Sequence, residues 1–369
     1  MPDHQQTSTP LPPDARGVVA ATGPRGQAEG LGAHWLRETL ASLPDAVIHA
    51  ERYPEFVRNM PLSSVTQRPD GTFDHHYRLT YSVVSSDGAN RYQLLPPMTG
   101  PGEEGDAAPV RIMDVTGSSH YRWEFHRPES GGGTIVVVYG RTDLRHSGGI
   151  WKACLQHAQT LEHGLATVIQ MTLMLAMKAR AEQAPGSFAP YVSPRPGTRL
   201  PSYQPLLDRG LVALLRSQQG RLLDLSLVER SKAAPERVLS AAAQVADWSS
   251  FVPTISKSVP TGGPPPVVDI EQTLPMLSFR TSYGVQQGPG AVDLFGLAGD
   301  LRGARLRFDA RPDGAQKATQ VVLRGQMHYD KGSMVLRQLY KMEPLFEYGV
   351  NLGLGLTLLR GVRQQAERL

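Results

Sequence analysis

The chain contains a single cysteine, Cys154, among its 369 residues. One thiol cannot form an intramolecular disulfide or a cysteine-rich zinc site, so neither device can stabilise the fold. Sparse cysteine is typical of proteins from a reducing compartment. We therefore expect a cytoplasmic protein held together by an ordinary hydrophobic core, in which Cys154 is a small core residue.

Long apolar runs are also missing. The most apolar stretch, 164–176, is interrupted by Thr167, Gln170 and Thr172 and falls short of the ~20 residues that a membrane-spanning helix needs. The first residues, MPDHQQTSTPLPPDARG, contain no basic segment followed by an apolar one, so they do not resemble a signal peptide. Because they are also poor in apolar side chains, we predict a flexible tail over 1–16.

No charge of one sign dominates. The sequence has 38 Lys and Arg against 34 Asp and Glu, for a net charge of +4 without a long basic run. Electrostatic capture of nucleic acid is therefore not expected. Transient contact with a membrane surface stays open, and the sequence does not indicate an oligomeric state.

Motifs for nucleotide binding or nucleophilic catalysis are absent too. There is no G-x-S-x-G elbow, P-loop or dinucleotide fingerprint, so we expect no cofactor. His75 and His76 are adjacent on a predicted strand and must point to opposite faces, so we predict no metal site there. His157 and His163 are six residues apart on a predicted helix and do not share a face.

What the sequence does contain is enough apolar residues, 40%, for a sizeable core, together with 37 glycines and 30 prolines. At about 150 residues per domain, the length suggests two or three domains. Six prolines fall close together and favour an extended chain. They predict a linker over 185–210 and are Pro185, Pro190, Pro194, Pro196, Pro201 and Pro205.

The two halves on either side of this linker resemble each other. A shift of 185 positions over 134–182 gives ten identical pairs, including Thr134 with Thr319 and Gly140 with Gly325; chance would give about three. At a slightly different offset, RYPEFV matches DWSSFV, residues 247–252. The repeated order of these landmarks predicts two copies of one domain, 17–184 and 211–369.

Hydrophobic periodicity predicts similar elements in both copies. In the second copy we expect a strand over 222–230, a helix over 234–245 and a kinked helix after 332, divided at Pro344. Five further strands lie between the helices, over 267–273, 277–285, 291–297, 304–310 and 319–329. In the first copy we expect helices over 35–43 and 149–183, a poor opening strand within 17–26, and strands over 73–84, 110–115, 121–125 and 134–144.

The aromatic turns RYPEFV and DWSSFVP, each followed by a sheet and a long closing helix, resemble the START-like helix-grip (SRPBCC) superfamily. LSLVERSKAAPERVLSAAAQVADWSSFVPTISKSV is similar to the opening strand, helix and turn of that family, and LAGDLRGARLRFDARPDG to its central strands. The resemblance implies an α+β fold in each copy, with a curved antiparallel sheet wrapped around the C-terminal helix. It also implies an elongated apolar cavity between sheet and helix.

Strand parity identifies the side chains that would line this cavity. We predict ligand contacts in the second copy from apolar and phenolic residues, and in the first copy from two aromatic residues. They are Phe279, Tyr283, Phe308, Leu323, Met327, Tyr329, Met342, Phe346, Tyr348 and Val350, with Tyr81 and Phe125. Gly349, Gly353 and Gly355 on the closing helix either leave room for a ligand or allow close packing against the sheet.

Two functions follow from these patterns. One is a carrier or sensor that binds a hydrophobic small molecule, such as a lipid, quinone or polyketide, by apolar burial. The alternative is a didomain polyketide aromatase/cyclase, which the tandem arrangement also resembles and which would use Tyr, His or Arg to assist aldol closure and dehydration. We favour binding, because the assigned inward faces are nearly all apolar; no catalytic residue is assigned.

Overall fold

A computed structural model gives the architecture of most of both copies. It describes residues 18–22, 28–36, 49–81, 84–93, 110–117, 119–126, 134–142, 172–173, 176–177, 207, 211–218, 221–274, 277–314, 317–327, 329, 332–342 and 346–369. The predicted tail over 1–16 lies outside these residues. So does the predicted linker over 185–210, except for Leu207, which is helical and buried.

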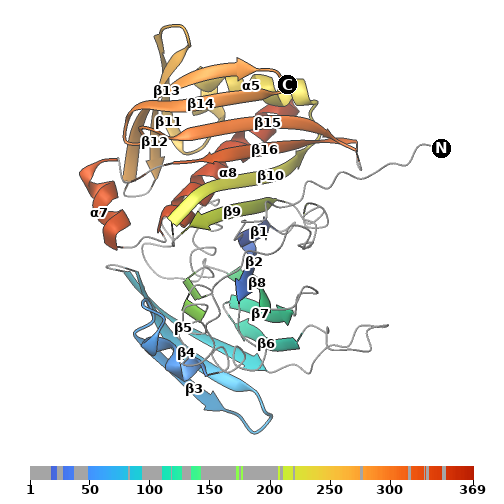
Figure 1. The fold of residues 1–369 in the computed structure, drawn as a ribbon, viewed down its shortest axis with the longest axis vertical. Helices are drawn as coiled ribbons and strands as arrows, with labels where there is room; N and C mark the ends of the chain where they lie inside the picture. The colour runs from blue at the N-terminus through green and yellow to red at the C-terminus, as the bar shows by residue number, and fades with distance from the viewer. Residues whose placement is uncertain are drawn as a thin grey trace, which may run out of the picture.

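The described strands form one antiparallel sheet of sixteen strands (Figure 1). The first copy supplies β1 Val18–Thr22, β2 Ala28–Leu36, β3 Leu62–Gln67, β4 Phe73–Tyr81, β5 Val84–Gln93, β6 Val110–Gly117, β7 Ser119–His126 and β8 Thr134–Thr142. The second copy supplies β9 Val212–Gln218, β10 Arg221–Ser231, β11 Ile255–Gly262, β12 Val267–Leu274, β13 Leu277–Gly288, β14 Ala291–Gly299, β15 Arg305–Asp313 and β16 Ala318–Gln326.

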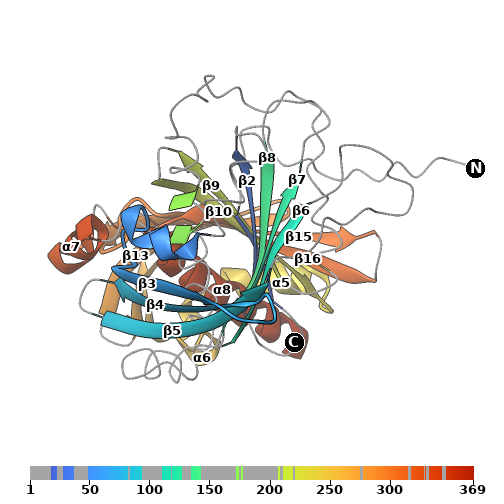
Figure 2. The same cartoon turned by 90° about the horizontal axis from the view of Figure 1, so that it is seen from below.

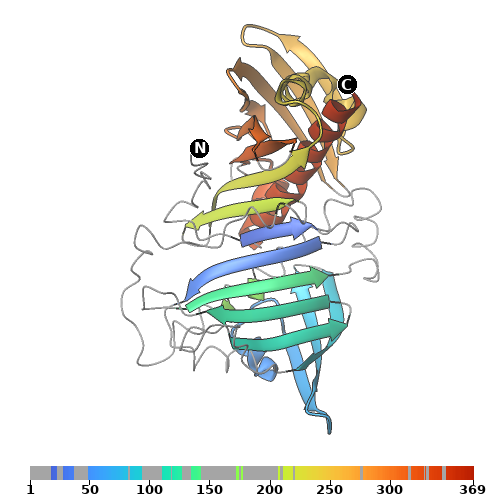
Figure 3. The ribbon, with the colours of Figure 1, turned by 90° about the vertical axis from the view of Figure 1, so that its right-hand side faces the viewer.

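The two copies have the same strand order and meet edge to edge. The order is β11-β12-β13-β14-β15-β16-β10-β9 in the second copy and continues as β1-β2-β8-β7-β6-β5-β4-β3 in the first. β1 and β9 occupy equivalent places and pair antiparallel, with Ala20 opposite Ala213, so the joint relates the copies by a local two-fold axis. Figure 3 shows the sheet running through this joint, and Figure 2 shows β3–β5 turned away from β6–β8.

The aromatic turn is repeated in three dimensions as well as in sequence. It forms the short helix η1 Ala50–Glu55 in the first copy and α6 Trp248–Phe251 in the second. The N–H of Val57 donates to the carbonyl of Tyr53, and that of Val252 to Trp248, both at 2.7 Å. Since both aromatic residues and both valines are buried, the sequence match between the turns is confirmed.

Three longer helices belong to the second copy: α5 Pro235–Ala243, α7 Met334–Met342 and α8 Phe346–Arg368. Pro235 opens α5 at the first turn, where its missing N–H costs nothing. α8 is buried on every side from Glu347 to Leu359, as is typical of a helix enclosed by the rest of a fold.

Most predicted strands are confirmed, with boundaries shifted by a few residues. The helix predicted over 35–43 is wrong at its start, because Trp35 and Leu36 end β2, the true opening strand of the first copy. The strand predicted over 73–84 is two strands, β4 and β5. Of the helix predicted over 149–183, only four residues, 172–173 and 176–177, are described, and they are helical.

Candidate ligand site

Eight of the ten predicted lining residues of the second copy belong to one buried cluster, which contains residues of both the sheet and α8. Phe279 and Tyr283 lie on β13, Phe308 on β15 and Leu323 on β16, while Met327 and Tyr329 follow the end of β16. These six residues join Tyr348 and Val350 of α8 in one buried cluster. The rings of Phe279 and Tyr329 are 6.4 Å apart, centroid to centroid, so aromatic side chains from β13 and from the segment after β16 meet in this interior.

Two phenols in this cluster are buried among apolar side chains. Burial raises the pKa of Tyr283 above that of a free phenol. Burial also raises the pKa of Tyr329, and the neighbouring Tyr283 and Glu347 add to the effect. Both hydroxyls therefore stay protonated at neutral pH and are suited to donate a hydrogen bond to a carbonyl or hydroxyl group.

Asn351 of α8 fixes the chain segment that carries these side chains. Its amide oxygen accepts from the N–H of Met327 at 2.9 Å, and its amide nitrogen donates to the Met327 carbonyl at 3.3 Å. The same nitrogen donates to the carbonyl of Glu347 at 2.9 Å. The side chain of Asn351 thus makes the two backbone hydrogen bonds to Met327 that a neighbouring strand would otherwise make. In this way it holds Tyr329 close to α8. The alternation of apolar and polar residues did not predict a buried Asn351, because that pattern assigns polar residues to the exposed face.

The glycines of α8 had two interpretations, and at Gly355 the structure favours close packing. A Cβ atom added there would lie 2.9 Å from Cδ1 of Leu227 and 3.2 Å from Cδ2 of Leu225, both on β10. The absent side chain lets the helix approach the sheet. Gly355 therefore supplies no argument for a cavity.

Four predicted contacts cannot be placed in the same way. Met342 ends α7 and Phe346 begins α8, while Tyr81 ends β4 and Phe125 lies on β7. The side chains of all four lie outside the described residues. They remain predictions from the sequence.

In the first copy, a polar and aromatic cluster on β3–β5 escaped the sequence analysis. His75 is buried and His76 is exposed, so the prediction that the two histidines face opposite ways is confirmed. Ser63 donates to the carbonyl of Ala50 at 2.5 Å, which uses its only hydrogen. At the 2.8 Å contact between them, Nε2 of His75 therefore donates to Ser63 Oγ, which fixes the tautomer of the ring.

Acidification should destabilise the protein through His75. Burial lowers the pKa of His75 to about 4, from about 6.5 in an unfolded chain. The stability contributed by the neutral ring is fully present above pH ~6.5 and is lost as the pH falls toward 4, by up to roughly 3 kcal/mol. Urea midpoints measured between about pH 7 and about pH 4.5 should therefore fall less in His75→Gln than in the wild type.

The control for this experiment is His76→Gln, at the adjacent exposed position. In His75→Gln the new side-chain amide keeps a neutral N–H that can donate to Ser63, so the two variants differ mainly in which ring can no longer take a proton. His76→Gln should keep most of the acid loss of the wild type, because burial affects the pKa of His75 more than the charge of His76 does. An acid loss in His75→Gln equal to that of the wild type would refute the role assigned to His75.

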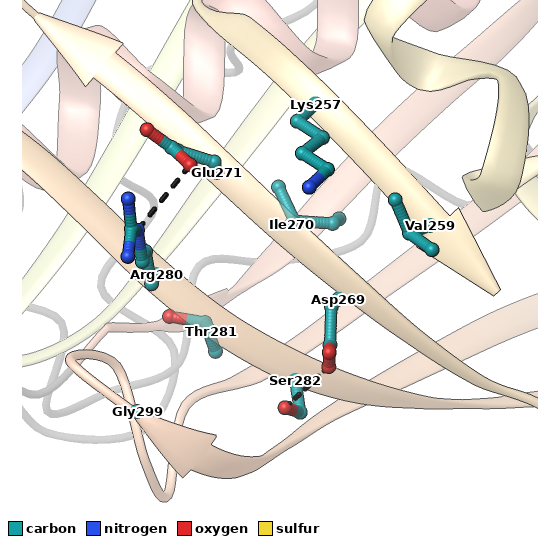
Figure 4. Close-up of a pocket in the computed structure, with 9 residues that line it drawn as sticks. All are labelled: Lys257, Val259, Asp269, Ile270, Glu271, Arg280, Thr281, Ser282 and Gly299. Atoms are coloured by element: carbon teal, nitrogen blue, oxygen red, sulfur yellow. Dashed lines mark hydrogen bonds and ion pairs between the residues drawn. The ribbon is translucent and has the colours of Figure 1, made fainter. Parts of the chain in front are cut away.

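A separate pocket of about 360 Å³ lies on the other face of β11–β13 (Figure 4). Its lining includes the charged side chains of Lys257, Asp269, Glu271 and Arg280, with Arg280 Nε 3.3 Å from Glu271 Oε2. Because Arg280 alternates with Phe279 along β13, this pocket and the apolar interior share strands but face opposite ways. Arg280 therefore points away from the apolar interior, with 79% of its side chain exposed.

Neither a metal-ligand cluster nor a membrane-crossing helix is found among the described residues. Within the described ranges, no three His, Cys, Asp or Glu side chains are grouped so that they could hold a metal ion. Of the helices that the structure describes, none combines the length and hydropathy needed to cross a bilayer.

Comparisons with known proteins give structural similarities only. No protein-family model matches the chain, and no curated protein matches it either. Among solved structures, the di-domain aromatase/cyclase StfQ of the steffimycin pathway is 13% identical, with 92% of this chain and 98% of that one covered and a TM-score of 0.29. The di-domain aromatase/cyclase BexL of the BE-7585A pathway is 11% identical, with the same coverage and a TM-score of 0.28.

A fragment of the STAR-related lipid transfer protein from Xanthomonas axonopodis is 14% identical, with 46% of this chain and 96% of that one covered and a TM-score of 0.34. At scores this low, the grounds for the fold are the strand order, the repeated aromatic turn and the helix packed on the sheet. These features agree with the START-like fold that the sequence resemblance implies.

Proposed function

We propose that the chain binds a hydrophobic small molecule, such as a lipid, quinone or polyketide, between the sheet and α8 of its second copy. The observation that carries this proposal is the convergence of Phe279, Tyr283 and Tyr329 in the buried cluster under α8. Each copy, 17–184 and 211–369, would then be a helix-grip domain, joined to the other by the linker over 185–210. A cytoplasmic location and transient membrane contact remain predictions from the sequence.

Apolar burial would supply most of the affinity. A ligand that buries about 300 Å² of apolar surface gains roughly 7 kcal/mol before the costs of association. One hydrogen bond from Tyr283 or Tyr329 would add only about 1 kcal/mol. The phenols would therefore orient the polar end of the ligand, and the apolar walls would hold the rest.

Native mass spectrometry of the purified full chain, followed by organic extraction, tests the binding proposal. We expect an apolar molecule to be recovered in stoichiometric amount. Repeated recovery of empty protein that also ignores added lipids, quinones and aromatic polyketides would contradict it.

The second candidate function is a didomain polyketide aromatase/cyclase. It is supported by the buried phenol of Tyr329, which lies near Glu347 and near the buried phenol of Tyr283 and could polarise a carbonyl group. Tyr283→Phe and Tyr329→Phe separate the two functions. If the site only binds, each variant should change ligand affinity by less than about tenfold. If the site catalyses ring closure of a poly-β-ketone chain, turnover should fall by about 10² or more while binding is kept.

A further inference from the structure

Equivalent positions in the two copies carry different chemistry. The N–H of Thr80 donates to the carbonyl of Asn59 at 2.8 Å, and that of Thr273 to Thr254 at 2.7 Å, which makes Thr80 and Thr273 equivalent. Counting back along β4 and β12 from these residues makes His75 equivalent to Val268. His75 pairs with Asn90, and Val268 pairs with Tyr283.

By the same count, Tyr77 is equivalent to Ile270. The inward positions that hold Val268 and Ile270 in the second copy thus hold a histidine and a tyrosine in the first. Packing a sheet on a helix does not require polar groups at these positions, since the second copy manages without them at both.

Among the described residues, the hydrogen bonds of this cluster leave one buried acceptor without a donor and put a lone pair on the ring of His75. Nε2 of His75 donates to Ser63, so the other ring nitrogen, Nδ1, carries the lone pair of the neutral ring. The amide nitrogen of Asn90 donates to the hydroxyl of Tyr77 at 3.3 Å. The amide oxygen of Asn90 is buried and, within the part of the chain that the structure describes, accepts no hydrogen bond.

A buried hydrogen-bond acceptor without a donor destabilises the folded state. Asn90 is only 8% exposed, and leaving such a group without a donor costs about 1–3 kcal/mol. Asn90 and His75 lie directly opposite each other on adjacent strands, so their side chains stand on the same face of the sheet. Two acceptors side by side are well placed to receive hydrogen bonds from one molecule.

The surroundings of these acceptors are aromatic. The ring of Tyr53 meets that of His75 edge to face at 5.7 Å, and Tyr92 does so at 6.5 Å. Tyr92 also stacks on Phe73 at 4.9 Å. Such walls favour a flat ring, by offset or edge-to-face contact.

We propose that the inner face of β3–β5 is a second ligand site, which binds a hydroxylated aromatic molecule whose hydroxyl groups donate to Asn90 Oδ1 and His75 Nδ1. The second copy offers no such pair of acceptors, because the equivalents of Asn90 and His75 are Tyr283 and Val268. The two copies would then recognise different parts of a substrate, or different molecules.

Matched probes test this proposal on the full chain. Isothermal titration with 2-naphthol and with naphthalene compares ligands of nearly the same shape, of which only the first can donate a hydrogen bond. We expect the wild type to bind 2-naphthol about tenfold more tightly, which corresponds to one hydrogen bond. Asn90→Leu replaces the acceptor by an apolar side chain of similar size and should bring the two affinities within about twofold of each other.

Two further variants make the result specific. Ala89→Leu places the same new side chain at an exposed position one residue away and should keep the tenfold preference. His75→Gln, which retains a donor to Ser63, should weaken the preference and remove the ¹⁵N signal of the His75 ring that shifts when 2-naphthol is added. Histidine labelled at both ring nitrogens reports this shift directly.

The proposal is overturned if 2-naphthol and naphthalene bind the wild type equally. It is also overturned if Asn90→Leu and His75→Gln both fold and both still bind 2-naphthol about tenfold more tightly than naphthalene. In that case the ¹⁵N signals of the remaining histidines would be the same as in the wild type. Neither result affects the proposed site of the second copy, since the variants and the labelled ring all belong to β4 and β5.

Discussion

Trp248→Ala should destabilise the protein by about 3–5 kcal/mol, the cost of removing a large side chain from a packed core. Trp248 is 1% exposed and meets Phe308 of β15 edge to face at 6.0 Å. It also begins α6, the turn that sets the direction of the chain into β11. Both the sheet and the turn therefore lose a contact when the indole is removed.

Trp248→Phe should cost much less, and this comparison makes the prediction specific. The indole Nε1–H is buried and, within the described ranges, has no acceptor. Phenylalanine removes this unsatisfied donor, which recovers about 1–3 kcal/mol and offsets much of the volume lost. Urea denaturation followed by circular dichroism measures both free energies of unfolding.

Phe251→Ala is the control for the turn. Phe251 ends α6 but is only half-buried, so its removal should cost no more than about 2 kcal/mol. We expect Trp248→Ala to lower the free energy of unfolding the most. If Trp248→Phe lowers it by as much as Trp248→Ala, the indole N–H must be hydrogen-bonded in the native state.

The strands of the second copy could be predicted because most alternate cleanly between apolar and polar residues. β11 could not, because it is an edge strand and most of its residues beyond Ile255 are exposed. β2 was mistaken for the start of a helix, since AEGLGAHWL contains two glycines and no regular alternation. Pairing with β8 on one side and β1 on the other makes it a strand despite its sequence.

For the candidate site, too, the local sequence pattern predicted only some of the residues. Parity found Phe279, Tyr283 and Tyr329, because apolar and aromatic residues at alternate positions indicate a buried face. The rule assigns polar residues to the outside, and so it passed over Asn351, His75 and Asn90. Their burial depends on partners far away in sequence, such as Met327 for Asn351. No local pattern reports such a partner, which is why the polar half of each site needs the structure.

Asp313→Asn should cost about 3–5 kcal/mol, because it removes one partner of a buried ion pair. Nε of Arg230 on β10 donates to Oδ2 of Asp313 at 2.6 Å, with only 14% and 3% of the two side chains exposed. β16 lies between β10 and β15, so the pair bridges across a central strand. Asparagine has almost the same shape as aspartate, and the loss is therefore one of charge rather than of packing.

The matched control is Asp87→Asn in the first copy. Arg78 Nε donates to Asp87 Oδ1 at 2.7 Å, a contact nearly as short, but 49% and 69% of these side chains are exposed. Water and salt screen such a pair, so its loss should destabilise the protein far less than the loss of the buried pair. Thermal unfolding should separate the two variants by roughly 10 °C, and added salt should reduce only the effect of Asp87→Asn. Equal destabilisation would mean that burial of Asp313 does not govern the strength of its ion pair.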